Sequence, residues 1–262
     1  MIKAIFFDVD GTLVSFRQKF LSDRLLEDLP ALRERGIEIF LSTGRALQDL
    51  DRTGMLRGVQ FDGFVTLNGQ YCCDADGTAY RDAPISMEDL RGAYEVLMAN
   101  PDLPALMEGS TESYLTQIND RVREVYEFLH TQLYPVRSPE WLLEGKVYQF
   151  VPFVTPEEEE LFLAAMPGCE RTRWHSEGID IVPRSGGKGT GVRAAMERYG
   201  FAREEIMAFG DGENDIGMME LAGTGVAMGN APEPVKAIAS YVTGTAEEGG
   251  VPQALRHFGL LP

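Results

Sequence analysis

Residues 4–12, Ala4-Ile5-Phe6-Phe7-Asp8-Val9-Asp10-Gly11-Thr12, carry the clearest indication of the fold. A short apolar run that ends in an acidic turn is typical of a strand buried on both faces of a parallel sheet. Strands of this kind alternate with helices that cover the two faces of the sheet. We therefore expect a parallel α/β sheet that begins with residues 4–7.

The same pattern recurs on both sides of a long middle segment. Further apolar runs predict buried strands at 37–41, 64–67, 206–209 and 225–228. Helices are expected at 22–35, from residue 46, at 188–199 and up to residue 221, with Ser22 as a cap and with Gly36 and Gly200 as ends. Two strand–helix units followed by a third strand predict a right-handed, doubly wound sheet.

The middle segment has a different pattern. Asp76-Gly77 between two apolar runs predicts a hairpin. Beyond it we expect helices at 86–98, 119–131 and from the acidic run 157–160, and strands at 104–107, 113–116, 147–151 and 179–182. The predicted organisation is an α/β core domain, residues 1–82 and 184–262, into which an α+β domain, residues 83–183, is inserted.

Composition excludes several classes of protein. Hydrophobic residues make up 44% and charged residues 25% of the 262 positions, which is ordinary for a folded globular chain. Acidic residues outnumber basic residues by 41 to 24, for a formal charge of −17. Such a surface repels nucleic acids and anionic lipids, so we expect neither as a partner. An anionic substrate would need a local positive group, such as a metal ion or a few lysines.

Cysteine usage and hydropathy indicate the compartment. Cys72 and Cys73 are adjacent and Cys169 is isolated, which is typical neither of a disulfide scaffold nor of a Cys-x-x-Cys metal site. The chain has no apolar run near the ~20 residues that cross a bilayer, and its N-terminal run meets Asp8 too early for a signal peptide. We expect a cytoplasmic protein that is a monomer or a weak homo-oligomer.

Asp8 and Asp10 stand where the first strand ends. Side chains i and i+2 of an extended chain share a face, so we expect these two carboxylates to lie close together. Like charges at such a distance raise one pKa unless a cation joins them. One carboxylate can then bind a hard divalent cation while the other moves a proton. A plain Asp10-Gly11 turn is the alternative, but it leaves Asp8 at the end of a buried strand unexplained.

Asp211 and Asp215 follow the strand expected at 206–209 and offer further hard oxygen ligands. Mg²⁺ is commonly held by one or two protein carboxylates together with a substrate phosphate. Because ligands of open α/β sheets bind at the carboxyl ends of the strands, we expect Asp8 and Asp211 to converge on one ion. Simple capping of the next helix by Asp211 or Asn214 stays open as an alternative.

Two further motifs suit a phosphate group. Thr43-Gly44 stands at the entry to a helix, where backbone N–H groups and a hydroxyl can bind phosphate oxygens. Lys188 follows Gly186-Gly187, whose backbone freedom can bring an ammonium group into a crevice. The alternatives are that Ser42 or Thr43 is only a helix cap and that Lys188 is a surface residue.

The motifs occur in the order known from one superfamily. They are Asp8-Val9-Asp10-Gly11-Thr12-Leu13, Thr43-Gly44-Arg45, Asn68-Gly69, Glu177-Gly178-Ile179-Asp180-Ile181 with Pro183, Lys188-Gly189, and Gly210-Asp211-Gly212-Glu213-Asn214-Asp215. Over its whole length the chain resembles the haloacid dehalogenase-like (HAD) superfamily and, within it, the Cof-type phosphatases of subfamily IIB. The resemblance implies a Rossmann-like core with an inserted α/β cap domain that selects the substrate.

The resemblance also implies Mg²⁺-dependent phosphoryl transfer through an aspartyl-phosphate. Asp8 would be the nucleophile, and Asp10 would be the general acid and then the general base. The groups that would hold the phosphoryl oxygens are Thr43, Gly44, Lys188 and Asn214. Mg²⁺ would bind Asp8, the backbone carbonyl of Asp10 and Asp211, with Asp215 in the outer coordination sphere.

The implied reaction is the hydrolysis of small phosphorylated metabolites, sugar phosphates foremost. Arg45, Asn68 and Asp180 would face the leaving group. Two alternatives stay open: a phosphosugar mutase of the phosphomannomutase type, which needs a basic cluster in the cap domain, and a binding protein that kept the fold and lost catalysis. The intact set of Asp8, Asp10, Lys188 and Asp211 argues against the second alternative.

Overall fold

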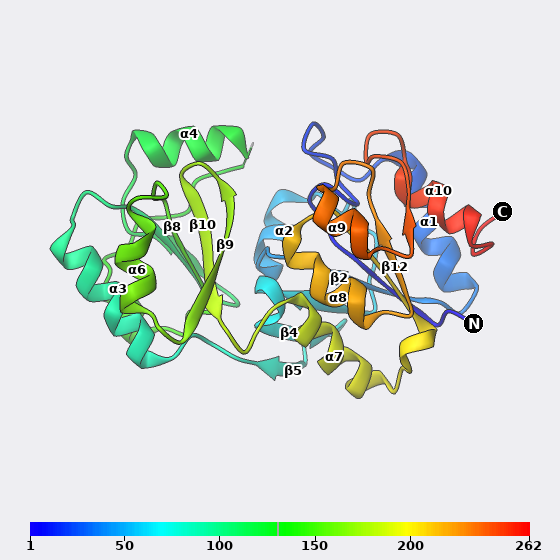
Figure 1. Ribbon diagram of the computed structural model, residues 1–262, viewed down its shortest axis with the longest axis horizontal. Helices are drawn as coiled ribbons and strands as arrows, with labels where there is room; N and C mark the ends of the chain where they lie inside the picture. Colours follow the sequence, from blue (N-terminus) through cyan, green and yellow to red (C-terminus); the bar gives the residue numbers. More distant parts are fainter. Residues whose placement is uncertain (130) are drawn as a thin grey trace. The chain divides into compact units, whose positions relative to one another are not determined.

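The chain forms two compact units (Figure 1). The structure is a computed structural model that describes residues 1–129 and 131–262, so His130, at the end of the helix expected over 119–131, lies outside the described residues. The first unit consists of Met1–Asp82 and Gly187–Pro262, and the second consists of Ala83–Gly186. The second unit is therefore an insertion in the first, and it ends at Gly186 rather than at residue 183.

The first unit is built on an eight-stranded sheet. Its strands are β1 (Ala4–Phe7), β2 (Glu38–Ser42), β3 (Gly63–Thr66), β4 (Tyr71–Asp74), β5 (Ala79–Asp82), β11 (Ile206–Gly210), β12 (Thr224–Ala227) and β13 (Tyr241–Val242). Their order is β13-β12-β11-β1-β2-β3-β4-β5, with parallel pairing from β13 to β3 and antiparallel pairing for β4 and β5. The carboxyl ends of the six parallel strands therefore meet at one side of the sheet.

Both faces of this sheet are covered by helices. These are α1 (Asp23–Glu34), α2 (Leu47–Thr53), α7 (Lys188–Tyr199), α8 (Ile216–Leu221), α9 (Glu233–Ile238) and α10 (Gly250–His257), with the short 3₁₀ turns η1 (Leu67–Gly69), η2 (Arg203–Glu205) and η3 (Glu213–Asp215). Ile5 and Phe7 of β1 pack in a cluster with α1, α2 and α10, whereas Ala4 and Phe6 pack with α7, α8 and α9. The continuous apolar run of β1 is explained by burial on both sides.

The second unit has a five-stranded sheet of order β7-β6-β8-β10-β9, in which each neighbouring pair is antiparallel. Its strands are β6 (Ala105–Glu108), β7 (Ser113–Leu115), β8 (Gln149–Pro152), β9 (Cys169–His175) and β10 (Gly178–Pro183). Its helices are α3 (Met87–Ala99), α4 (Asp120–Phe128), α5 (Trp141–Glu144) and α6 (Glu159–Ala165). Helices α3 and α6 pack on one face of the sheet, and α4 packs on the other.

Most expected elements are present within one or two residues of their predicted ends, and the expected parallel α/β class is confirmed. The main omissions are strand β9, whose sequence Cys-Glu-Arg-Thr-Arg-Trp-His lacks an apolar run, and the elements α9, β13 and α10, which follow the last predicted strand. Strand β9 lies at the edge of its sheet with β10 as its neighbour, and most of its side chains are not buried. Among residues 1–129 and 131–262, the structure has no helix that is long and apolar enough to cross a membrane.

Phe40→Ala is expected to lower the free energy of unfolding by about 3–5 kcal/mol, because it opens a cavity in a close-packed layer. Phe40 has no exposed surface, stacks on Phe6 and meets Tyr199 and Phe201 edge-on. Urea unfolding followed by circular dichroism measures the loss. Phe16→Ala is the control, since Phe16 is 61% exposed and its change should stay within about 0.5 kcal/mol. Equal losses in the two variants would contradict the core position of Phe40.

Candidate active site

Asp8 lies at the carboxyl end of β1, between the neighbouring strands β11 and β2. Its backbone N–H donates to the Phe209 carbonyl oxygen at 3.0 Å, which extends the pairing of β1 with β11 by one residue. The residue is only 5% exposed. The sheet itself therefore holds this carboxylate in a buried position at the strand ends.

Lys188 joins three segments of the site. It is the first residue of α7, and its side chain is 1% exposed, so the interpretation as a surface lysine is wrong. Its Nζ donates to Asp8 Oδ1 at 2.5 Å and to Asp215 Oδ1 at 2.6 Å. Asp215 is fully buried, and its Oδ2 accepts the backbone N–H groups of Asp211 and Gly212 at 3.0 and 2.9 Å. The ammonium group thus connects β1, the loop after β11 and the start of α7.

Asp211 is held from two sides. Its Oδ1 accepts a hydrogen bond from the Thr12 hydroxyl at 3.2 Å, and its Oδ2 accepts one from Asn230 Nδ2 at 2.9 Å. Gly11 has a φ of +85°, and a Cβ at that position would overlap the Asp211 carboxylate. Glycine is therefore needed at residue 11 both for the left-handed backbone and for the close approach of Asp211.

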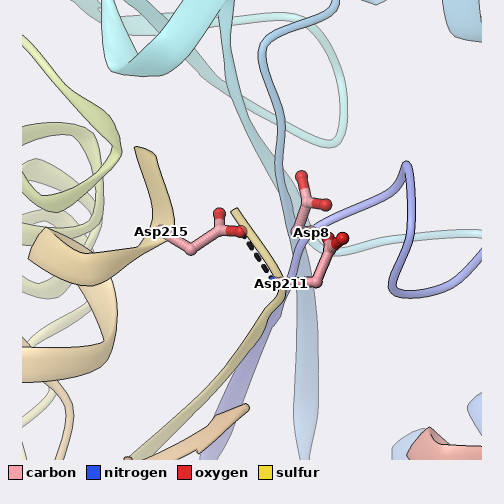
Figure 2. A group of neighbouring side chains, drawn as sticks. All are labelled: Asp8, Asp211 and Asp215. Carbon is pink, nitrogen blue, oxygen red and sulfur yellow. Dashed lines mark hydrogen bonds between the residues drawn. The ribbon is translucent and has the colours of Figure 1, made fainter. Parts of the chain in front are cut away.

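The three carboxylates of Asp8, Asp211 and Asp215 form one buried cluster (Figure 2). One oxygen from each lies within 4.8 Å of the others. Lys188 offsets one of the three negative charges, so a divalent cation would balance the remainder. Buried carboxylate oxygens are ligands that Mg²⁺ prefers, so the residues present fit a magnesium ion.

Burial dominates the ionisation of this cluster. It raises the pKa of Asp8 well above its usual value, and the attraction of Lys188 offsets this only in part. It also raises the pKa of Asp211 to about 7, with the charge of Asp215 as the next cause. Burial acts to lower the pKa of Lys188, but Asp215 and Asp8 more than offset it, so the net direction is upward and the ammonium stays charged. Without another cation, protons taken up by these carboxylates would relieve part of the negative charge near neutral pH.

Asp10 is paired with Arg45, which was expected at the leaving group. Arg45 Nε lies 2.6 Å from Asp10 Oδ2, and Arg45 Nη2 lies 2.7 Å from Asp10 Oδ1. This is a two-pronged ion pair in which one guanidinium engages both carboxylate oxygens. Both side chains are partly exposed, at 34% for Asp10 and 21% for Arg45. The pair links the end of β1 to the loop after β2.

Thr43 follows β2 and is almost fully buried. Its N–H donates to the Val65 carbonyl oxygen at 2.8 Å, and its Oγ1 accepts the Arg45 N–H at 3.1 Å. Helix α2 has Ala46 as its N-cap, without a side-chain capping bond. The interpretation of Thr43 as a helix cap is therefore wrong, and its hydroxyl lies in the loop at the strand end.

Asn214 and Asn68 contact each other. Asn214 Nδ2 donates to Asn68 Oδ1 at 3.0 Å, which links the loop after β11 to the turn after β3. The N-cap positions of η3 and α8 are Gly212 and Asp215, so capping is not the role of Asn214 or of Asp211. Asp180 belongs to the second unit, where it lies on β10 and accepts a hydrogen bond from Trp174 Nε1 at 2.7 Å.

Two residues of the site were missed in the sequence. Thr12 stands inside the Asp8–Thr12 motif and hydrogen-bonds Asp211. Asn230 follows β12, and its Nδ2 also donates to the Gly11 carbonyl oxygen at 2.9 Å. The signal for Asn230 was present, because it is a polar residue that follows an apolar run, as Asp8 and Asp211 do.

Lys188→Met should lower the free energy of unfolding at pH 7.5 by about 3–5 kcal/mol, because it leaves Asp8 and Asp215 buried without their cation. The loss should shrink toward pH 5, because burial raises the pKa of Asp8 and its protonation removes part of the uncompensated charge. Urea unfolding at several pH values measures it. Lys3→Met is the control, because Lys3 pairs with Glu205 but is 58% exposed, and its effect should not exceed about 1 kcal/mol. A small, pH-independent loss for Lys188→Met would contradict the charge cluster.

Asp211→Asn should change how stability depends on pH when a chelator is present. Burial raises the pKa of Asp211 in the folded protein from an ordinary value of 3.8 to about 7, so its contribution to stability is present below about pH 4 and is lost as pH rises through 7. Asparagine does not ionise, so the variant does not lose stability at residue 211 as pH rises. The free energy of unfolding of the variant, relative to wild type, should rise by about 2.5 kcal/mol between pH 5 and 8. An unchanged difference across this range would contradict the raised pKa.

Comparisons with known proteins identify the family of the chain. A family model described as haloacid dehalogenase-like hydrolase matches residues 5–255. The solved structure of the HAD subclass IIB sugar phosphatase BT4131 is 35% identical, with a TM-score of 0.85, and the match covers 99% of this chain and 100% of that one. BT1666 from Bacteroides thetaiotaomicron, described among phosphatases of the same superfamily, is 33% identical with a TM-score of 0.89, and the match covers 100% and 96%.

A curated relative extends the comparison to a named substrate. It is the 5-amino-6-(5-phospho-D-ribitylamino)uracil phosphatase YcsE of Bacillus subtilis (strain 168), which is 28% identical over 260 residues, covering 99% of this chain and 96% of that protein. The family match spans both units of the fold and includes Asp8, Lys188 and Asp211. The chain therefore belongs to the haloacid dehalogenase-like hydrolases.

Proposed function

We propose that this protein is a Mg²⁺-dependent phosphatase that hydrolyses small phosphorylated metabolites, sugar phosphates foremost, through an aspartyl-phosphate on Asp8. The observation that carries the proposal is the buried cluster of Asp8, Asp211 and Asp215 around Lys188. The similarity to a sugar phosphatase and to a phosphatase of a ribityl phosphate supports the substrate class.

The proposed metal site uses Asp8, the backbone carbonyl of Asp10 and Asp211, with Asp215 farther from the ion. When bound there, Mg²⁺ supplies positive charge that offsets the repulsion between the Asp8 carboxylate and the phosphoryl oxygens. Thr12 and Asn230 orient Asp211 through their hydrogen bonds, and partners of this kind commonly tune metal affinity.

The proposed reaction has two steps. In the first, an Asp8 carboxylate oxygen attacks phosphorus, the bond to the leaving oxygen breaks, and Asp10 gives that oxygen a proton. In the second, Asp10 takes a proton from water, and the water oxygen attacks the phosphorus of the aspartyl-phosphate. Inorganic phosphate leaves and the Asp8 carboxylate is restored. Lys188 binds Asp8 Oδ1 and keeps the carboxylate oriented in both steps.

The proposed phosphate donors are the Thr43 hydroxyl, the Gly44 N–H, the Asn214 amide and Lys188. They come from loops after β2 and β11 and from the start of α7, which meet around Asp8 at the carboxyl ends of the strands. Donors held in this way are oriented before substrate arrives, so they can stabilise charge that develops on the phosphoryl oxygens.

Arg45 and Asp180 are proposed to select the leaving group. Both oxygens of Asp10 accept hydrogen bonds from Arg45, so one of these bonds has to open before Asp10 can donate a proton. A leaving group with hydroxyls offers Arg45 other partners, which favours sugar phosphates over apolar esters. Asp180 lies on the sheet of the second unit, which we propose as the substrate-selecting cap domain.

The phosphosugar mutase alternative is less well supported. A mutase holds a bisphosphate, so it needs cationic groups in the cap domain that are available to a second phosphate. Arg121 of the second unit pairs with Glu158 at 2.7 Å, and Arg173 pairs with Glu159 at 2.6 Å. These two arginines are already neutralised by carboxylates. Release of inorganic phosphate without a bisphosphate activator would separate a phosphatase from a mutase.

Hydrolysis of p-nitrophenyl phosphate with MgCl₂, compared with an EDTA control, tests the proposal. Asp8→Asn should abolish turnover, because it removes the nucleophile. Asp10→Asn should lower kcat by about 10²–10⁴-fold while magnesium binding, measured by calorimetry, is kept, because the contact at residue 10 is a backbone carbonyl. Asp51→Asn, an exposed carboxylate on α2, is the control and should leave kcat unchanged.

Several outcomes would contradict parts of the proposal. Equal turnover in Asp8→Asn would remove the nucleophile assignment, and equal turnover with EDTA would remove the metal. A wild-type protein that binds phosphate esters but never hydrolyses them would be the binding protein instead. In a screen of phosphorylated metabolites, a higher kcat/KM for nucleotides than for hexose phosphates would contradict the substrate class alone.

A further inference from the structure

The turn after β3 has an unusual backbone. Leu67, Asn68 and Gly69 all have positive φ angles, of 52°, 54° and 82°. Glycine adopts this region freely and asparagine tolerates it, but a leucine there is uncommon. Such a conformation persists only where surrounding contacts hold it, and it is found mostly at functional sites. The contacts of this left-handed turn, residues 67–69, therefore indicate what it does.

The backbone of the left-handed turn is tied to the loop after β2. The Leu67 N–H donates to the Arg45 carbonyl oxygen at 3.1 Å, and the Asn68 N–H donates to the Thr43 carbonyl oxygen at 3.1 Å. These two bonds bracket Gly44, whose N–H is one of the proposed phosphate donors. The turn therefore fixes the backbone on both sides of Gly44.

The left-handed turn also packs against the start of α7. A Cβ at Gly69 would overlap the carbonyl oxygen of Gly187, the residue that precedes Lys188. The Gly69 carbonyl oxygen accepts a hydrogen bond from Arg81 Nε at 2.8 Å, which anchors the turn on β5. The left-handed turn thus contacts both the loop after β2 and the segment that leads into α7.

The Asn68 side chain reaches a third motif. It is 4% exposed, and its Oδ1 accepts a hydrogen bond from Asn214 Nδ2 at 3.0 Å. Its Nδ2 lies 3.2 Å from the place where a Cβ on Gly44 would stand. The carboxamide therefore fills the space between Gly44 and Asn214, the two proposed phosphate-binding residues that lie on either side of it.

We propose that Asn68 is a positioning residue that sets the distance between the Gly44 loop and Asn214, and that the left-handed turn exists to hold it there. The left-handed backbone lets Asn68 bind Thr43 through its N–H and Asn214 through its carboxamide at the same time. This role is an alternative to the contact with the leaving group that the family resemblance implies for Asn68. The proposal rests on the proposed function, because it concerns how the phosphate donors are arranged.

Asn68→Ala and Asn68→Gly separate the side chain from the backbone. Both remove the carboxamide, but only glycine relieves the positive φ, so Asn68→Gly should unfold at a higher temperature than Asn68→Ala. Calorimetric titration with inorganic phosphate in MgCl₂ should give a Kd about tenfold higher than wild type for both variants. Arg57→Gly is the control: Arg57 is another non-glycine residue with positive φ, and its side chain contacts Leu21 and Asp23 instead. Its phosphate Kd should equal that of wild type.

A double-mutant cycle tests the coupling. Asn68→Gly combined with Asn214→Ala should bind inorganic phosphate no more weakly than Asn214→Ala alone, because Asn68 acts through Asn214. If the losses of phosphate affinity in the two single variants multiplied in the double variant, the proposal would be overturned. A wild-type phosphate Kd in Asn68→Gly would also overturn it, above all if KM for a sugar phosphate rose at the same time, since that result would make Asn68 a contact for the leaving group.

The double-mutant cycle also distinguishes a failure of the positioning role from a failure of the proposed function. A wild-type protein that neither binds inorganic phosphate nor hydrolyses any ester would overturn the phosphatase assignment and the role in phosphate binding together. Urea unfolding of the same four proteins would then still report the link between Asn68 and Asn214. Additive changes in the unfolding midpoint would show that the two residues act independently and would overturn the positioning role by itself.

Discussion

The site depends on the balance of charge among buried carboxylate and ammonium groups. At the ends of β1 and β11, oxygens of three carboxylates lie within 4.8 Å of one another, and the Lys188 ammonium group bonds two of these carboxylates. None of the four residues is more than 9% exposed. Burying unpaired charge is costly, so an arrangement with excess negative charge does not arise from optimising stability alone. It is explained if a divalent cation completes the balance. Burial is the main cause of the raised pKa values of Asp8 and Asp211, and the neighbouring carboxylate of Asp215 raises both further.

The sheet makes this gathering possible, and it could be predicted from the sequence. Buried parallel strands leave a strong signal, because apolar residues on both faces give continuous runs such as Ala4–Phe7. Polar residues directly after those runs had to meet at one side of the sheet. Asp8, Thr43 and Asp211 follow from that rule. Lys188 follows from it less directly, since it begins a helix, and its burial between Asp8 and Asp215 became visible only with the packing of α7.

Other features of the site depend on contacts that leave no periodic signal. The ion pair of Asp10 with Arg45 joins residues from two different strand ends, and either side chain has other possible partners. The positive φ of Leu67 is held by two backbone hydrogen bonds, from the Leu67 N–H to the Arg45 carbonyl oxygen and from the Asn68 N–H to the Thr43 carbonyl oxygen. A leucine in the sequence does not indicate such a backbone conformation. Strand β9 is similar, because an edge strand needs little apolar surface. Structure can be predicted from sequence where burial requires apolar residues. It cannot be predicted where the conformation depends on one specific contact between residues far apart in the chain.

Because the overall charge is −17, the neutral hydrogen-bond donors of the site are important for binding an anionic phosphate ester. Repulsion of an anionic ester by distant carboxylates is screened beyond about 8 Å at physiological salt, so capture depends on groups at contact distance. Lys188 already shares its charge between Asp8 and Asp215, and Arg45 shares its charge with Asp10. Much of the remaining attraction must come from oriented N–H and O–H dipoles, whose strength falls steeply with misalignment. A turn that holds Gly44 and Asn214 at a fixed spacing would therefore keep two of these donors aligned with the phosphate.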